Sequence, residues 1–228
     1  MADSPKLLTI NMELYNLLFI SYLVPADRIR PLVPTELALS SLNNKVFISA
    51  VAMQCRMVHL FNLTWPGFNY DQLNLRTYVI DPETGDPAVY FFRSAVSSRI
   101  IPAATLIIGI PWTHISFNLL TECSANETFY RAVGNWNGDI DILMRSSLIR
   151  NSQDAVIKHI TEPLVGFTGR GQNLKRIVIT HNVLDVRFLS LMEIKFNLPV
   201  KDGLLDASEL NKPDSVLIVP QTKFSIFI

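Results

Sequence analysis

The chain has 228 residues, of which 49% are hydrophobic and 18% are charged. Such a composition supplies a large core and excludes an intrinsically disordered chain. The 20 basic and 20 acidic side chains cancel, which argues against an electrostatic nucleic-acid binder, because such a protein needs a basic face. The length fits one of the larger single domains, so we expect one domain over 1–228.

The sequence carries no signal for export or for a membrane partner. Residues 1–8 lack the basic, apolar and small-residue order of a signal peptide. The apolar run 14–24 is shorter than the roughly 20 residues that a spanning helix needs. Cys55 and Cys123 lie far apart, which indicates structural thiols in a reducing compartment; the alternative, a single disulfide between them, has no further support in the sequence. We therefore expect a cytoplasmic protein.

The first elements in chain order are a strand and a brief helix. Residues 12–22 are rich in Leu, Ile, Phe and Tyr, which favours a strand. A helix is expected over 25–32, because proline at its start and an acidic residue in its first turn suit a helix N-terminus. A second strand is expected over 45–57, and an aromatic loop over 59–70.

The clearest strand pair lies in the middle of the chain. Apolar and polar residues alternate over 72–80, which predicts a strand with one apolar and one polar face. Turn residues follow, and then the run 88–95 has aromatic and β-branched residues on both faces, as in a fully buried strand. A short buried helix is expected over 98–108, ended by Gly109, with a new strand over 114–119.

The remaining elements predict a mainly β protein. Many strands, few short helices and no alternating βα pattern favour a β-rich α+β fold with mostly antiparallel pairing. The later elements expected are strands over 128–133, 140–149, 176–180, 188–198 and 216–228, a helix over 154–160 and a flexible glycine loop over 166–171.

Three segments of the central region carry a family resemblance. They are N-L-R-T-Y-V (74–79), A-V-Y-F-F-R-S-A-V (88–96) and G-I-P-W (109–112), supported by P-L-V-P (31–34) and S-V-L-I-V-P (215–220). Together they resemble the YqjF-type proteins, which are distant relatives of acetoacetate decarboxylase, and the resemblance covers most of the chain. It implies an acetoacetate decarboxylase-like antiparallel β-cone or barrel around a central cavity, with a few short helices outside.

The resemblance does not extend to the family's nucleophile. Acetoacetate decarboxylase forms a Schiff base with a lysine whose pKa is lowered by burial beside another cation. In that family two consecutive lysines follow the turn after the buried helix, and here those positions hold Trp112 and Thr113. The family's arginine and acidic positions match Tyr15, Ser49 and either Asp71 or Gln72. The resemblance therefore implies the fold but not the Schiff-base reaction.

Arg76 is the main candidate for binding a ligand. On its strand it shares a face with Asn74 and Tyr78. Inside a barrel these groups would form a donor-rich wall for a carboxylate, which arginine holds through two parallel hydrogen bonds. The alternatives are a solvated strand face or a structural ion pair with an acidic side chain.

The other candidates are aromatic residues and histidines. Trp112 and Tyr90 are expected either as walls of the cavity or as core residues. His114 shares strand parity with Trp112 and would then reach the cavity, whereas His181 lies in T-H-N-V-L-D-V, where YqjF-type chains also carry a histidine. Single histidines are more often structural, and no spacing in the sequence predicts a metal site or a cofactor motif.

These observations favour a barrel protein that binds a small carboxylic acid. The first hypothesis is a lyase or isomerase acting on a small oxo- or hydroxy-acid without a Schiff base. The alternative is a non-catalytic carrier, sensor or interaction module with the same fold. The charged fraction of 18% is below the roughly 25% of typical domains, so we also expect a homo-oligomer, most simply a dimer, that hides apolar surface.

Overall fold

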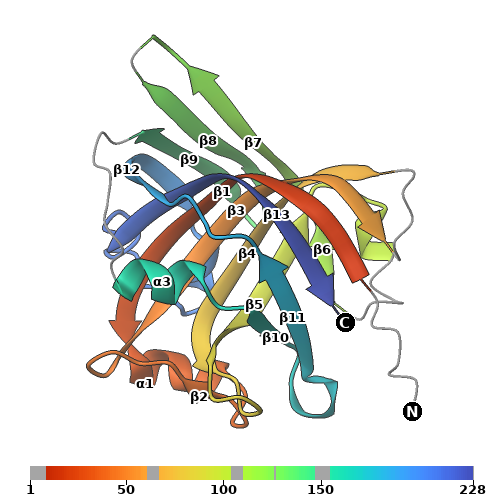
Figure 1. The fold of residues 1–228 in the computed structure, drawn as a ribbon. Coiled ribbons are helices and arrows are strands. Elements are labelled where there is room, and N and C mark those ends of the chain that lie inside the picture. Colours follow the sequence, from red (N-terminus) through yellow and green to blue (C-terminus); the bar gives the residue numbers. More distant parts are fainter. Residues whose placement is uncertain (1–8, 61–66, 104–109, 126, 147–154, 228) are drawn as a thin grey trace.

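The computed structural model describes residues 9–60, 67–103, 110–125, 127–146 and 155–227. Strands dominate the described chain, and the helices are short (Figure 1). None of the helices in these ranges is long and apolar enough to cross a membrane. The helical elements are α1 (Ala26–Ile29), η1 (Arg30–Leu32), α3 (Ala155–Thr161), η2 (Gly171–Asn173) and α4 (Leu198–Lys201).

Seven strands close into a barrel, which confirms the predicted mainly β fold. Neighbours in the barrel pair antiparallel except β5 and β10, which run parallel. The first and last strands of the chain are neighbours and complete the ring. In barrel order the strands are β1 (Thr9–Pro25), β3 (Lys45–Leu60), β4 (Phe68–Ile80), β5 (Pro87–Val96), β10 (Val165–Thr168), β11 (Lys175–His181) and β13 (Ser215–Phe227).

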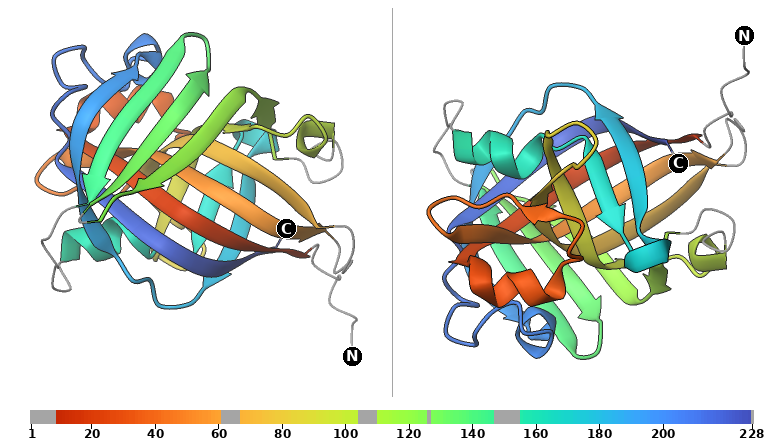
Figure 2. Two further views of the ribbon diagram at one scale, coloured as in Figure 1. Left: turned by 90° about the horizontal axis from the view of Figure 1, so that it is seen from above. Right: turned by 90° about the horizontal axis from the view of Figure 1, so that it is seen from below.

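A second layer of strands crosses one side of the barrel (Figures 1 and 2). It contains β7 (Ser116–Cys123), β8 (Thr128–Asn135), β9 (Asp139–Ser146) and β12 (Arg187–Phe196). The layer is continuous with the barrel, because the start of β12 pairs with β13 before its remainder pairs with β9. Two further short strands extend the barrel wall: β2 (Ala38–Leu39) pairs with β4, and β6 (Trp112–His114) pairs parallel with β5.

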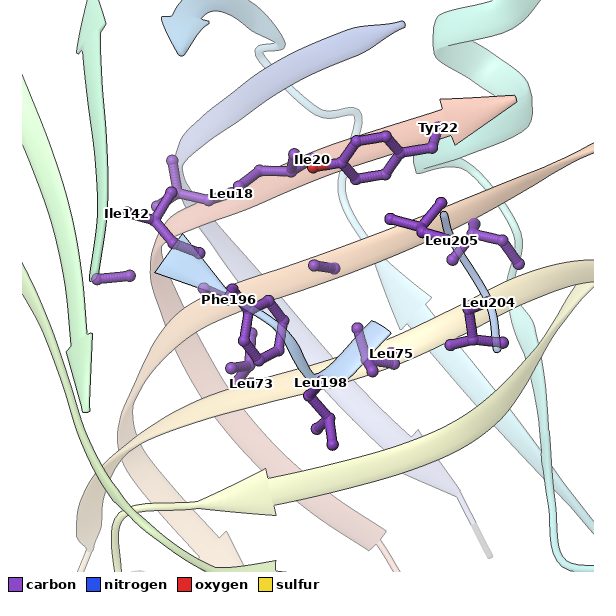
Figure 3. Close-up of a cluster of buried hydrophobic side chains, with 14 of the residues drawn as sticks. Leu18, Ile20, Tyr22, Leu73, Leu75, Ile142, Phe196, Leu198, Leu204 and Leu205 are labelled. Atoms are coloured by element: carbon purple, nitrogen blue, oxygen red, sulfur yellow. The ribbon is translucent and has the colours of Figure 1, made fainter. Parts of the chain in front are cut away.

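The two faces of the barrel wall bury two separate hydrophobic clusters. The outer core lies between the barrel and the second layer, and Figure 3 shows its side chains converging from both. Its members include Leu18, Ile20, Tyr22, Leu73, Leu75, Ile142, Phe196, Leu198, Leu204 and Leu205. The interior core lies inside the barrel, and its members include Leu14, Leu17, Phe19, Phe47, Val51, Met53, Cys55, Tyr78, Trp112, Ile160, Ile177 and Ile179. Strand alternation creates this division, because successive side chains point to opposite faces.

Two barrel strands extend into the segment predicted as an aromatic loop over 59–70. β3 continues to Leu60 and β4 begins at Phe68. The simple period of two is lost there because β3 bulges at Met57, whose φ of 49° lies in the left-handed region. The side chain of Asn69 accepts a hydrogen bond from the Met57 amide at 3.0 Å and holds the bulge. Residues 61–66 lie outside the described residues.

A flexible glycine loop was predicted over 166–171, but this prediction was wrong for residues 166–168, which belong to strand β10. Gly166 pairs with Val89 of β5. A Cβ atom at Gly166 would lie 2.7 Å from the ring of Phe91, so only glycine lets the ring approach the backbone this closely. Gly166 is thus required by a close contact within the barrel wall. From the sequence alone, a glycine of this kind looks the same as a glycine in a loop.

Two other predicted elements are described only in part. The expected buried helix over 98–108 is helical at 101–103, and residues 104–109 lie outside the described chain. The expected strand over 140–149 appears as β9, which ends at Ser146, and its last predicted residues also lie outside.

Candidate functional site

The interior core surrounds a cavity of about 90 Å³. This is several times the volume that one water molecule needs, so a small organic molecule has room inside. Most of the described residues that line it are aliphatic or aromatic. The polar or ionisable lining residues are Gln72, Asn74, Arg76, Ser94, Thr161, Thr168 and His181, and Trp112 adds an indole ring.

Arg76 reaches the cavity from the inner face of β4, as its alternation with apolar neighbours predicts. Its Nη2 donates hydrogen bonds to the carbonyl oxygen of Ile160 at 2.8 Å and to the Tyr78 hydroxyl at 3.3 Å. Its guanidinium carbon lies 5.2 Å from the centre of the Phe19 ring, where a cation is attracted to the π-electrons. Its Nε is buried without a hydrogen-bond partner.

Tyr78 and two buried serines hold this arginine in place. The Tyr78 hydroxyl donates to the Ile160 carbonyl at 3.2 Å and lies 2.9 Å from Ser49 Oγ. Ser49 Oγ lies 2.7 Å from Ser21 Oγ. Because the Tyr78 proton is committed to the carbonyl, Ser49 donates to Tyr78 and Ser21 donates to Ser49. The chain of hydroxyls therefore fixes the orientation of the ring against which the guanidinium packs.

A second arginine, Arg176 on β11, shows how this protein satisfies a buried charge. Its Nη2 lies 2.7 Å from a carboxylate oxygen of Asp81, whose side chain is fully buried. Hydrogen bonds from Arg176 lower the pKa of Asp81 below its usual value. In contrast, no carboxylate among the described residues lies within ion-pair distance of Arg76. The predicted alternative of a structural ion pair for Arg76 is therefore wrong within the described chain.

Asn74, Ser94 and Trp112 form a row across three neighbouring strands. Asn74 pairs with Ser94 in the register of β4 and β5, and Ser94 pairs with Trp112 in the register of β5 and β6. All three side chains line the cavity. The Oδ1 atom of Asn74 is buried and has no hydrogen-bond partner. The row thus adds a second unpartnered polar atom and one aromatic surface to the wall that carries Arg76.

Two of the predicted site residues do not join the cavity. Tyr90 belongs to the outer core, and its hydroxyl donates to the carbonyl of Gly169 at 3.3 Å. It points outward because β5 alternates, and Phe91 takes the inward position beside it. His114 is exposed, since β6 ends at this residue and the strand has already left the cavity. Their predicted roles as a wall and as a polar partner were wrong.

His181, whose role the sequence left open, does line the cavity. Its ring stacks on Phe224 with a centroid distance of 5.9 Å and an interplanar angle of 10°. Its Nδ1 lies 2.8 Å from the carbonyl oxygen of Asn182, and its Nε2 is buried without a partner. The alternation of β11 contains the signal that would have found it, because Ile177 and Ile179 share its strand face and are apolar.

Lysine and acidic side chains are absent from the described lining of the cavity. The lysines of the described chain are all exposed, namely Lys45, Lys158, Lys175, Lys195, Lys201, Lys212 and Lys223. Arg76 and His181 are therefore the ionisable side chains that the described lining offers. No group of three or more histidine, cysteine or acidic side chains in these ranges could hold a metal ion.

Comparison with known protein families identifies the family of this chain. A family model described as "Uncharacterized conserved protein (COG2071)" matches residues 11–223. The chain belongs to the DUF2071 family. The match spans nearly the whole sequence and includes all or most of each barrel strand, so the DUF2071 assignment covers most of the cavity lining as well. No curated protein matches the sequence.

Solved structures show that this DUF2071 protein has an acetoacetate decarboxylase-like fold. Acetoacetate decarboxylase from Legionella pneumophila matches with a TM-score of 0.60 and 13% identity, over 100% of this chain and 92% of that one. An acetoacetate decarboxylase-like enzyme from Sphingomonas wittichii matches with a TM-score of 0.60 and 9% identity, over 96% and 89%. The enduracididine biosynthesis enzyme MppR, complexed with pyruvate, matches with a TM-score of 0.57 and 11% identity, over 98% and 87%. The predicted distant relationship is confirmed.

Proposed function

We propose that this protein binds a small carboxylic acid inside its barrel, with the carboxylate held by Arg76. The observation that carries the proposal is the arginine itself, which lines a cavity, has a buried and unpartnered Nε, and faces no described carboxylate. Arg76 as a whole is half-buried, but a charge that is partly removed from water without a counter-ion is destabilising, so an anionic ligand would complete the site. The MppR complex with pyruvate shows that one protein with a similar fold binds a small oxo-acid.

The reaction we propose is lyase or isomerase chemistry on a small oxo- or hydroxy-acid, without a Schiff base. An imine-forming lysine needs a lowered pKa, which burial and a neighbouring cation provide. The described lysines are exposed, and the resemblance matches the family's lysine pair to Trp112, which is buried, and Thr113, which is exposed. In this site the carboxylate would be held by Arg76, with Asn74 beside it and Trp112 as an apolar wall.

The alternative function, a non-catalytic carrier or sensor, is favoured by one observation. The described lining offers His181 as its single imidazole and has no carboxylate or lysine, so acid–base chemistry would have to use one residue. The two functions are separated by incubating the protein in D₂O with each acid that stabilises it and following the ligand by ¹H NMR. Deuterium incorporation or conversion identifies an enzyme, and an unchanged spectrum over a day identifies a carrier.

The first prediction tests the binding site by thermal unfolding. We expect the wild-type protein to gain stability from at least one acid in a panel of short oxo-, hydroxy- and unsubstituted acids, by about 2.7 kcal/mol at a hundredfold excess over Kd. Arg76→Met keeps the bulk and removes the charge, so this gain should disappear. Arg131→Met is the control, because Arg131 is an exposed arginine that pairs with Asp141 on the second layer. The proposal fails if no acid stabilises the wild type, or if Arg76→Met gains as much.

A second prediction concerns assembly, and we propose a homodimer. Its support is apolar surface on the second layer, where Leu120 of β7 and Met192 of β12 are 45% and 50% exposed. Burying such groups against a second copy removes apolar area from water. We expect light scattering at micromolar concentration to give twice the 25.7 kDa chain mass. A mass of one chain would contradict this.

A further inference from the structure

The cavity carries an acceptor as well as a cation. His181 Nδ1 lies 2.8 Å from the carbonyl oxygen of Asn182, and a carbonyl oxygen only accepts hydrogen bonds. Nδ1 must therefore carry the proton of the neutral ring. Nε2 then presents a lone pair, and it is buried without a hydrogen-bond partner. Stacking on Phe224 holds the ring in this orientation.

An unpartnered acceptor selects a ligand that brings a donor. Leaving a buried acceptor unpaired is costly, so a site built this way discriminates against a ligand that lacks the matching group. The donor could be a hydroxyl or an ammonium group. No acidic side chain among the described lining residues would balance an ammonium, and an uncompensated second cation in the cavity would be unfavourable. A neutral hydroxyl is the donor that fits.

The barrel also sets the distance between the hydroxyl and the carboxylate. Arg76 lies on β4 and His181 on β11. In the closed strand order β5 and β10 separate them on one side, and β3, β1 and β13 on the other. The two side chains therefore approach the cavity from opposite parts of the wall. A ligand that contacts both needs its hydroxyl on a carbon away from the carboxylate.

From these observations we infer that the ligand is a short-chain hydroxy acid with its hydroxyl beyond the 2-position, and that His181 is its specificity-determining residue. This inference rests on the proposed function, because Arg76 must hold the carboxylate. It goes further by choosing hydroxy-acids over oxo-acids, since an oxo group brings no donor to the lone pair of Nε2.

Isothermal titration calorimetry with four probes tests the inference: butanoate and its 2-, 3- and 4-hydroxy derivatives. We expect 3- or 4-hydroxybutanoate to bind the wild type about tenfold more tightly than butanoate, as one buried hydrogen bond would give. 2-Hydroxybutanoate would bring its donor to the wall that carries Arg76, where Asn74 Oδ1 is the unpartnered acceptor, so any gain that it shows should survive the loss of the His181 acceptor. Equal affinities for all four acids would overturn the role of His181 while leaving the proposed function intact.

Variants separate the two proposals further. His181→Phe keeps the stacked ring and removes the acceptor, so the preference for the hydroxylated acid should fall to about one while butanoate still binds. His181→Gln restores a side-chain oxygen near the position of Nε2, so part of the preference should return. Arg76→Met should abolish binding of every acid. If no acid binds the wild type, the proposed function and this inference both fail.

A spectroscopic measurement makes the test independent of how the variants fold. In ¹⁵N-labelled wild-type protein, we expect the His181 ring to show a protonated Nδ1 and an unprotonated Nε2. The Nε2 signal should shift when the hydroxylated acid is added and stay in place with butanoate. A protonated Nε2 in the free neutral ring would overturn the inference.

Discussion

The outer core buries more side chains than the interior core, 37 against 23 among the described residues, and the two cores also differ in how they treat polar atoms. In the outer core the Tyr22 hydroxyl donates to the Leu210 carbonyl at 2.8 Å, and the side chains shown in Figure 3 are almost all aliphatic. Four buried polar atoms in the described chain have no partner, and three of them, on Asn74, Arg76 and His181, belong to the lining of the interior cavity; the fourth is Nδ1 of His59. The protein thus places most of its packing on one face of the barrel wall and most of its unsatisfied groups on the other.

This division has a physical reason. Unpaired buried polar groups lower stability, and a barrel that keeps a cavity forgoes the contacts that would fill it. The second layer supplies a well-packed core that compensates for these losses. The interior can then remain incomplete and receive a ligand.

The largest expected effect is on the free energy of unfolding, when the same leucine-to-alanine substitution is made in each of the two cores. Leu75 in the outer core and Leu14 in the interior core are 0% and 1% exposed, and Leu14 also lines the cavity. We expect Leu75→Ala to lower the free energy of unfolding by about 3–4 kcal/mol, and Leu14→Ala by about 2 kcal/mol, because a leucine beside a void has fewer neighbours to lose. Urea denaturation measures both. Equal losses would show that the two cores are packed alike.

A smaller effect is expected at the buried pair of Asp81 and Arg176. Asp81→Asn should cost about 2–3 kcal/mol, below the roughly 3–5 kcal/mol of a fully buried pair, because the Arg176 side chain is 26% exposed. The folded pKa of Asp81 is lowered by hydrogen bonds from Arg176. The stability that Asp81 contributes is therefore present above the unfolded pKa, near 4, and is lost as pH falls through the folded pKa.

The check is urea denaturation of wild type and Asp81→Asn between pH 7 and pH 2.5. The gap between them should be constant from pH 7 to about 5 and narrow below pH 4. Asp141→Asn is the matched control, since Asp141 pairs with the exposed Arg131 on the second layer, and surface pairs contribute little. A gap that stays constant down to pH 2.5 would exclude a lowered pKa at Asp81.

The smallest expected effect is a difference in the reaction rates of the two cysteine thiols, which involves no change in the stability of the fold. Cys55 is buried in the interior core, and burial raises the pKa of its thiol to about 12. Cys123 at the end of β7 is exposed. Since the thiolate is the reactive form, a disulfide reagent at pH 8 should label one thiol per folded chain quickly and the second only after unfolding. Rapid labelling of both would contradict the burial of Cys55.

The sequence predicted which strand face carries the site better than it predicted which residues line the cavity. Period two over 72–80 placed Asn74, Arg76 and Tyr78 together, and the structure puts all three inside the barrel. The same parity argument was wrong for His114, because parity gives a face but does not say where a strand leaves the cavity. It would have found His181 had the apolar face of β11 been followed to its last residue.

Contacts between segments far apart in the chain could not be predicted from local sequence patterns. The parallel pairing of β5 with β10 joins residues that lie far apart in the chain, and Gly166 is explained only by the ring of Phe91 across that pairing. Likewise Asp81 and Arg176 each look like ordinary surface charges in the sequence. Their pairing depends on the closed barrel, which brings the end of β4 to β11.

The pairing of β1 with β13 has a consequence for how the protein folds. Thr9 lies opposite Phe227, so the last seam of the barrel joins segments separated by almost the whole chain. Such non-local pairing slows folding, because loop-closure entropy is lost before the contacts form. The cavity is walled by both strands and therefore does not exist until that seam closes. A ligand of this cavity would bind the closed barrel alone and, by mass action, hold the seam shut.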